Sequence, residues 1–111
     1  ESPRIVAAIS QEDEALLRNK PQEAIQSVRF IRHRHTEGFV DGHRIMSVRT
    51  GTVFHRLQFK SGDIILSYNG TPLIDTASLM NAFSNWNSET QHLFLIRRRN
   101  EVMVLDVQMN Q

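Results

Sequence analysis

The sequence predicts one α+β domain made of short strands and a few helices. Three patterns indicate this: a turn–strand–turn stretch at 59–73, an apolar stripe with helical spacing at 75–86, and alternating residues at 27–35 and 92–99. A chain of 111 residues is long enough to bury a single core without disulfides or metals.

The most informative stretch is residues 59–73. A Gly-Asp step leads into an apolar run at 64–66, and Asn69 and Gly70 stop the strand that contains this run. Asn and Gly both tolerate a positive φ, so the pair predicts a tight turn after a buried strand. Asp75 then stands where it can cap a helix.

Composition and charge exclude several classes of function. The net charge of +1 gives no overall attraction to nucleic acid or anionic lipid. The absence of cysteine excludes disulfides, thiolate metal sites and a cysteine nucleophile. No run approaches the roughly 20 apolar residues that span a bilayer, and no stretch has the pattern of a signal peptide. Because the chain begins at Glu1, we expect an excised fragment whose membrane anchor was left behind.

Residues 1–26 predict a helical lead ahead of the main domain at 27–111. The apolar residues among the first nine fit one side of a helix or a loose extended segment. Ser10 can cap a helix whose first turn is acidic, as the helix dipole favours. Pro21 suits the first turn of a second short helix. We expect this lead to pack on the domain or on another copy of it.

The main domain is expected to alternate strands with two helices. Strands are predicted at 27–35 and 39–48, followed by a short helix over 53–58 that Thr52 can cap. The longer helix runs to about residue 86, and its apolar stripe has the spacing i, i+3, i+4, i+7: Leu79, Ala82, Phe83 and Trp86. After a loop at 87–90, the strand at 92–99 and residues 102–107 complete a hairpin.

This order of elements, with a Gly-Asp strand and an Asn-Gly turn ahead of the longer helix, resembles PDZ domains. The resemblance covers residues 27–111 and implies a partly open β-sandwich or barrel with two core helices. PDZ domains usually carry a glycine at the position of Gln58, so we expect Gln58 in or near the left-handed region.

Two further strings resemble the periplasmic PDZ domain of the type II secretion inner-membrane C protein. The first is the lead at 16–21, Leu-Leu-Arg-Asn-Lys-Pro, which is similar to the helical Leu-Arg-x-Pro lead of that family. The second is the string Gly42-His43-Arg44-Ile45, in which His43 replaces the usual aromatic residue. The resemblance implies a periplasmic domain of an inner-membrane-anchored protein, with membrane contact only through a segment outside this chain. It also implies protein partners, namely secreted proteins, the secretin or other secretion components, and self-association.

A PDZ core binds an extended peptide as an added strand between its second strand and the longer helix. That placement predicts nine binding residues: Gly42, His43, Arg44, Ile45, Met46, Ser78, Leu79, Ala82 and Phe83. The chain lacks the Gly-apolar-Gly-apolar loop that holds a terminal carboxylate, and Asp41 would repel one. We therefore expect internal strands or a folded partner, rather than a chain terminus, in the groove.

Catalysis and metal binding have weaker support. His55, Ser61 and Asp63 lie near each other in sequence, but no Gly-x-Ser-x-Gly motif accompanies them, and Asp63 suits backbone hydrogen bonds at the strand entry. His33 and His35 share a strand face, but a metal site needs a third ligand. We expect no catalytic residues, no metal and no cofactor.

The arginines at 29–34 and 97–99 suggest a basic patch, yet acidic residues balance them, so we expect no nucleic-acid partner.

The preferred function is a non-enzymatic protein-interaction module of the type II secretion machinery. The alternative is a regulatory PDZ module of a periplasmic protease, and the third hypothesis is a small enzyme that uses His55 and Asp63.

Overall fold

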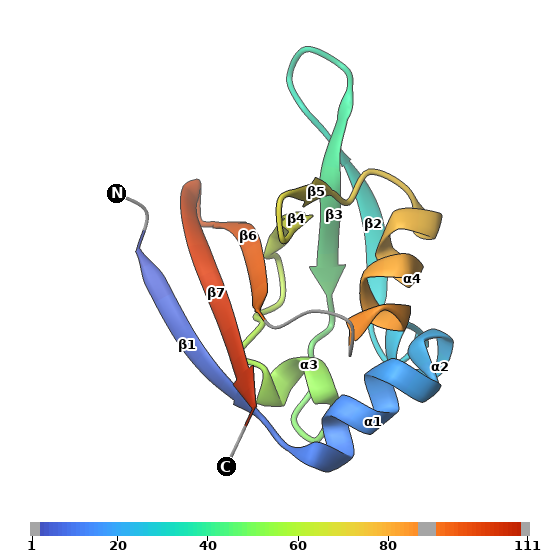
Figure 1. Cartoon of the computed structure of the whole chain (residues 1–111). Helices are drawn as coiled ribbons and strands as arrows, with labels where there is room; N and C mark the ends of the chain where they lie inside the picture. The colour runs from blue at the N-terminus through green and yellow to red at the C-terminus, as the bar shows by residue number, and fades with distance from the viewer. Residues whose placement is uncertain (1–2, 87–90, 110–111) are drawn as a thin grey trace.

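Seven strands and four helices make up the part of the chain that the structure describes, residues 3–86 and 91–109 of a computed structural model (Figure 1). In chain order they are β1 (Arg4–Ile9), α1 (Gln11–Asn19), α2 (Pro21–Gln26), β2 (Arg29–Arg34), β3 (Val40–Met46), α3 (Val53–Arg56), β4 (Ile64–Tyr68), β5 (Thr71–Pro72), α4 (Thr76–Ser84), β6 (His92–Arg98) and β7 (Glu101–Met109). The predicted α+β class is confirmed. The predicted loop at 87–90 lies outside the described residues. Among the described helices, none is long and apolar enough to cross a membrane.

The strands form one open sheet in the order β1-β7-β6-β4-β3-β2, with β5 paired to β4. β1 and β7 run parallel, whereas the other neighbours are antiparallel. The sheet does not close, so β1 and β2 form its two edges. The partly open arrangement predicted from the sequence is confirmed.

Aromatic rings dominate the core that joins the sheet to the helices. Phe54 on α3 packs edge-on against Phe59 and Phe83, with ring centroids 5.8 and 5.7 Å apart. Phe59 contacts Phe94 of β6 in the same way at 5.4 Å. T-shaped pairs of this kind add to the free energy gained from burial. Because α3 and α4 both contribute to this cluster, they are the two predicted core helices, and α1 and α2 pack beside α4.

The stretch at residues 59–73 folds as the sequence predicts. Ile65 in β4 has no exposed surface, and Asn69 and Gly70 have φ values of 49° and 84° in the turn that follows. Gln58 has a φ of 70°, so its expected left-handed backbone is confirmed. Three helices begin at capping residues whose side chains accept a hydrogen bond from the N–H three positions on: Ser10, Thr52 and Asp75.

The first part of the lead, residues 4–9, is a strand. The prediction that the lead is helical throughout is therefore wrong for these residues. β1 pairs with β7 from Arg4 opposite Val104 to Ile9 opposite Met109. Ala7 and Ile9 are fully buried, as expected for one face of a half-buried strand. The strand forms because β7 offers it an edge, which the local pattern does not contain. The lead therefore packs on the domain, and the division of the chain at residue 27 stays a prediction.

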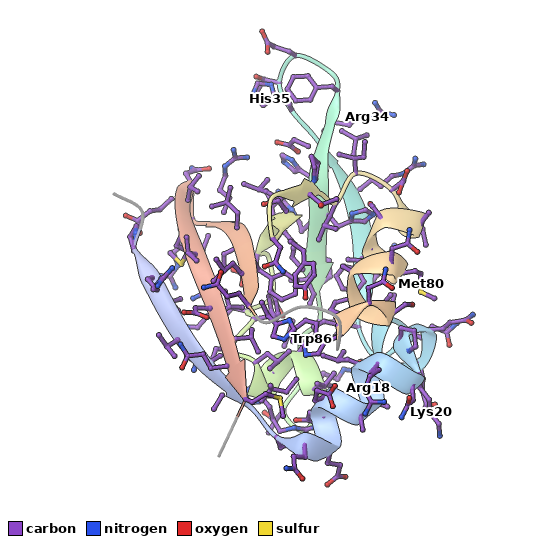
Figure 2. All side chains as sticks on the ribbon, in the orientation of Figure 1. Arg18, Lys20, Arg34, His35, Met80 and Trp86 are labelled. Carbon is purple, nitrogen blue, oxygen red and sulfur yellow. The ribbon has the colours of Figure 1, made fainter. Side chains whose placement is uncertain are left out.

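β2 and β3 form a hairpin that projects from the rest of the molecule (Figure 1). His35 lies at the projecting end (Figure 2), where its ring stacks on the exposed ring of Phe39 with centroids 4.6 Å apart. A register shift leaves Asp41 as an extra residue on β3, which is a β-bulge. The bulge brings the Asp41 carboxylate to His33 Nδ1 at 2.7 Å and to Arg97 Nη1 at 3.4 Å.

Candidate functional site

β3 is an interior strand, which rules out the predicted position of the added peptide. β2 pairs along one side of β3, and β4 pairs along the other. The prediction that a peptide joins the sheet at residues 42–48 is therefore wrong, because the hairpin places β2 outside β3. The free edge of the sheet beside α4 is β2 (Figure 1).

A groove of about 480 Å³ lies between β2 and α4, and the end of α2 closes it at the start of β2. Its walls come from four elements and the residue before β2: Ile25 and Gln26 of α2, Val28, Arg29, Phe30 and Arg32 at β2, His43 of β3, and Thr76 and Leu79 of α4. Val28, Phe30 and Arg32 are two residues apart, so they share the strand face that looks onto the groove. An unpaired strand edge next to a helix is the geometry needed for strand addition.

His43 forms the buried floor of this groove. Its side chain is only 3% exposed, and its Nδ1–H donates to the backbone oxygen of Leu73 at 2.8 Å. The ring of Phe30 stands edge-on to it with centroids 6.3 Å apart. The hydrogen bond to Leu73 fixes the orientation of the imidazole, so His43 supports the groove wall from below.

The rim of the groove at the start of α4 carries opposite charges. Asp75 accepts a hydrogen bond from Ser78 N–H at 2.7 Å, which is the main reason that its pKa lies below the ordinary value. The charges of His43 and Arg32 lower the same pKa further. Asp75 is therefore engaged in capping α4, while Arg32 stays exposed on the β2 side of the groove.

The nine predicted binding residues are divided between three places. Two of them, His43 and Leu79, line the groove. Ser78 and Ala82 line a different hollow of about 240 Å³, between α4 and the β4–β5 turn. The remaining five lie elsewhere: Phe83 and Ile45 are fully buried in the core, Gly42 is buried at the contact of β3 with β4, Arg44 is exposed, and Met46 is partly buried at the end of β3. A direct role of these residues in partner binding stays a prediction.

The groove residues on β2 and α2 are not among the nine predicted binding residues. From the sequence, the arginines at 29–34 are interpreted as solubilising residues or as an electrostatic rim for a protein partner, and no site residue is predicted in the lead. The available signal was the spacing of Val28, Phe30 and Arg32, which puts two apolar side chains and one cation on a single strand face. That spacing gains meaning only once β2 is known to be the edge strand.

The residues considered for catalysis have structural roles. The Asp63 carboxylate accepts hydrogen bonds from Lys60 N–H at 2.9 Å and from Arg98 at 2.9 and 2.8 Å. Its expected backbone hydrogen bond at the strand entry is confirmed. Ser61 Oγ accepts from Val48 N–H at 2.8 Å, and His55 is exposed on α3. The three side chains thus serve separate local purposes.

Histidines and carboxylates do not gather into a metal-binding set. Across residues 3–86 and 91–109, no group of three or more His, Cys, Asp or Glu side chains is arranged to hold a metal ion. His33 instead donates to Asp41, and His35 stacks on Phe39. Within the described residues, no third metal-binding side chain therefore joins His33 and His35.

Comparisons with known proteins agree with this geometry. The PDZ domain family model matches residues 11–109. A comparison with curated proteins found no matching sequence. Among solved structures, the PDZ domain of EpsC from Vibrio cholerae is 25% identical, with a TM-score of 0.59 and coverage of 87% of this chain and 90% of that one.

Two further structures share the fold. The PDZ domain of HtrA3, bound to a phage-derived ligand of sequence FGRWV, is 24% identical over 73% of this chain and 79% of its own, with a TM-score of 0.55. A shorter fragment of the EpsC PDZ domain is 21% identical over 73% of this chain and 92% of its own, with a TM-score of 0.51. The predicted resemblance to the PDZ domain of a type II secretion C protein is confirmed by the likeness to EpsC.

Proposed function

Because the chain belongs to the PDZ domain family, we propose that it binds other polypeptides by adding them as a strand to β2, in the groove that α4 walls. PDZ domains are protein-interaction modules and are generally not catalytic. The observation that carries the proposal is the unpaired edge of β2 beside a groove with an apolar side. Main-chain hydrogen bonds to β2 would supply affinity, and the groove side chains would select the sequence.

We further propose that this module is the periplasmic PDZ domain of an inner-membrane C protein of a type II secretion system, which recognises secreted proteins or other secretion components. Its support is the EpsC likeness, which extends over 87% of this chain, whereas the HtrA3 likeness extends over 73%. The alternative remains a regulatory module of a periplasmic protease. The EpsC match favours secretion, because it extends over more of this chain and of its own chain than the HtrA3 match does.

The groove can be tested by mapping a bound peptide onto the isolated domain. A peptide selected from a random library should perturb the amide NMR signals of β2 and α4, and should leave β1 unperturbed. Thr76→Arg is the matched variant, because Thr76 is exposed at the groove and an arginine there would fill it without disturbing the core. Perturbations centred on β1 would refute binding at the β2 edge.

The cellular role needs the full-length protein in its own bacterium. If the secretion role holds, the Thr76→Arg protein should accumulate normally but release less of the type II secreted proteins into the medium. A regulatory module of a protease would instead change the turnover of periplasmic proteins and leave secretion unchanged. The two readouts therefore separate the two candidate functions.

A further inference from the structure

We propose that the groove beside β2 binds an internal extended segment that carries acidic side chains, and not a free carboxyl terminus. The inference rests on the proposed function, because it names the class of partner that the same groove receives. Three observations carry it: the backbone N–H groups at the closed end of the groove, the free edge of β2, and the charges along that edge.

The closed end of the groove offers no free N–H pair to a carboxylate. Proteins that capture a chain terminus hold the carboxylate with consecutive backbone N–H groups. Here Ser27 N–H donates to the oxygen of Ala24 at 3.1 Å, and Val28 N–H points to the oxygen of Ile25 at 3.4 Å. The Ser27 hydroxyl donates to Ala24 as well, at 2.6 Å.

These hydrogen bonds cap the C-terminal end of α2. The last carbonyl groups of α2 lie at this end of the groove, and the C-terminus of a helix carries partial negative charge. A terminal carboxylate would meet carbonyl oxygens there and would find the nearby N–H groups already engaged. An internal segment carries no such charge at this position, so it avoids the repulsion.

The open edge of β2 has the length that an internal strand needs. β2 spans six residues, or roughly 20 Å at about 3.3 Å per residue. Main-chain pairing along this edge uses only N–H and C=O groups, which every internal segment of a partner provides. Binding therefore does not require a terminal group, provided that the partner presents an extended stretch of similar length.

The charges along the edge favour an acidic partner. β2 contains three arginines and no acidic residue, and the described residues that line the groove include Arg29 and Arg32 but no carboxylate. The carboxylate at the rim, Asp75, is engaged in capping α4. Opposite charges on adjacent strands stabilise a sheet, and like charges destabilise it. An acidic side chain on the added strand, placed opposite Arg32, would lie on the groove face that Arg32 shares with Phe30.

A plain structural role competes with this inference. Positive charges on an edge strand also keep folded proteins from pairing edge to edge and aggregating. If that were the whole role of the β2 arginines, added strands would be kept from this edge whatever their sequence, and no internal segment would bind. The two roles differ in whether acidic internal segments bind, so a selection experiment separates them.

The experiment uses two random decapeptide libraries and the whole chain as bait. In one library the decapeptide joins two folded carrier domains, and in the other it ends in a free carboxyl group. We expect binders from the first library, enriched in Asp and Glu. Binders from the free-carboxyl library should lose less than twofold in affinity when their termini are amidated.

Arg32→Glu is the variant that probes the charge, with Arg32→Gln as the gentler change and Arg49→Glu as the matched control. Arg49 is exposed and lies outside the lining of the groove. We expect Arg32→Glu to weaken a selected acidic peptide at least tenfold in fluorescence anisotropy, and Arg49→Glu to change its affinity less than twofold. Thermal melting of each variant by circular dichroism reports whether the fold is retained, and Arg32→Gln replaces Arg32→Glu if it is not.

Each outcome bears on one claim. Binders that appear only with a free carboxyl group, or that lose tenfold on amidation, would refute internal recognition while leaving the groove function intact. Internal binders without acidic enrichment would refute the charge preference while leaving internal recognition intact. Failure of both libraries would contradict the proposed function itself.

Discussion

The ion pair between Asp63 and Arg98 stabilises the entry to β4, and its loss should be costly. The Asp63 side chain is only 2% exposed, and that of Arg98 is 15% exposed. Arg98 donates to both oxygens of Asp63 at 2.9 and 2.8 Å, and to the backbone oxygen of Gln58 at 3.0 Å. One side chain thus joins β6 to the residue just before β4 and to the left-handed residue after α3.

The perturbation is Arg98→Met, which keeps much of the side-chain volume but removes the charge and all three hydrogen bonds. Of the hydrogen bonds to the Asp63 carboxylate described above, only that from Lys60 N–H would then remain, while the carboxylate stays almost wholly buried. Breaking a buried pair by removing one partner costs about 3–5 kcal/mol. Because Arg98 retains some exposure, we expect the lower end, about 3 kcal/mol, or a fall in Tm of roughly 10–15 °C.

Urea denaturation followed by tryptophan fluorescence gives the free energy of unfolding directly, since Trp86 is buried in the core. Arg4→Met is the matched control, because Arg4 is 56% exposed and lies 3.6 Å from Asp106. The control should lose less than about 1 kcal/mol. A loss below 1 kcal/mol for Arg98→Met as well would mean that burial of this pair does not control the stability of the β4 entry.

Four other predictions concern the core, the sheet and the hairpin. Ile65→Asp places an unpaired charge in the core and should abolish the cooperative thermal transition. Gly42→Ala brings a Cβ within 2.4 Å of the Ile65 backbone oxygen, which forces β3 from β4 and should cost about 1–3 kcal/mol in urea denaturation. Burial raises the pKa of Asp41, but hydrogen bonds and charges from His33 and a neighbouring arginine hold it below the ordinary value. Its stabilising effect is therefore present above about pH 4 and lost as the pH falls through the lowered pKa, so Asp41→Asn should lose less stability between pH 5 and pH 2. His55→Ala should leave peptide affinity unchanged, because His55 is exposed and outside the groove lining.

Each of these predictions has a contrary result. Ile65→Val should lose only about 0.5–1.5 kcal/mol, so equal melting of the Asp and Val variants would place β4 outside the core. An unchanged denaturation midpoint for Gly42→Ala would show that β3 and β4 can separate freely. Acid denaturation of Asp41→Asn that parallels the unchanged protein, with Glu37→Gln as an exposed control, would contradict the Asp41 assignment. Weaker binding by His55→Ala would extend the site to α3.

Local signals in the sequence were enough to predict most elements. The Asn69-Gly70 pair predicts its own backbone conformation, because both residues tolerate positive φ. The short apolar run before it, bounded by turn residues, is typical of a buried strand. Capping residues such as Asp75 mark helix starts through hydrogen bonds made within four residues. These features depend on neighbours in the chain, which is why the sequence alone could reveal them.

The errors concern features set by distant residues. The segment at 4–9 has apolar spacing that suits a helix or a strand, and only β7, about a hundred residues later, decides between them. The edge role of β2 depends on where the hairpin lies relative to β4, not on the alternation within β2. The ion pair between Asp13 and Arg56, at 2.7 Å, joins residues 43 positions apart, so no local pattern indicates it.

The parallel pairing of β1 with β7 gives the domain a particular response to mechanical load. β1 starts beside the middle of β7, and both strands run toward the same end of the molecule (Figure 1). Tension applied between the start of β1 and the end of β7 would therefore act along the strands, and six residue pairs would resist it together instead of separating one after another. The β1–β7 pairing therefore resists a shearing force in this direction, and the domain can carry tension between these two points without unfolding first at this pair of strands.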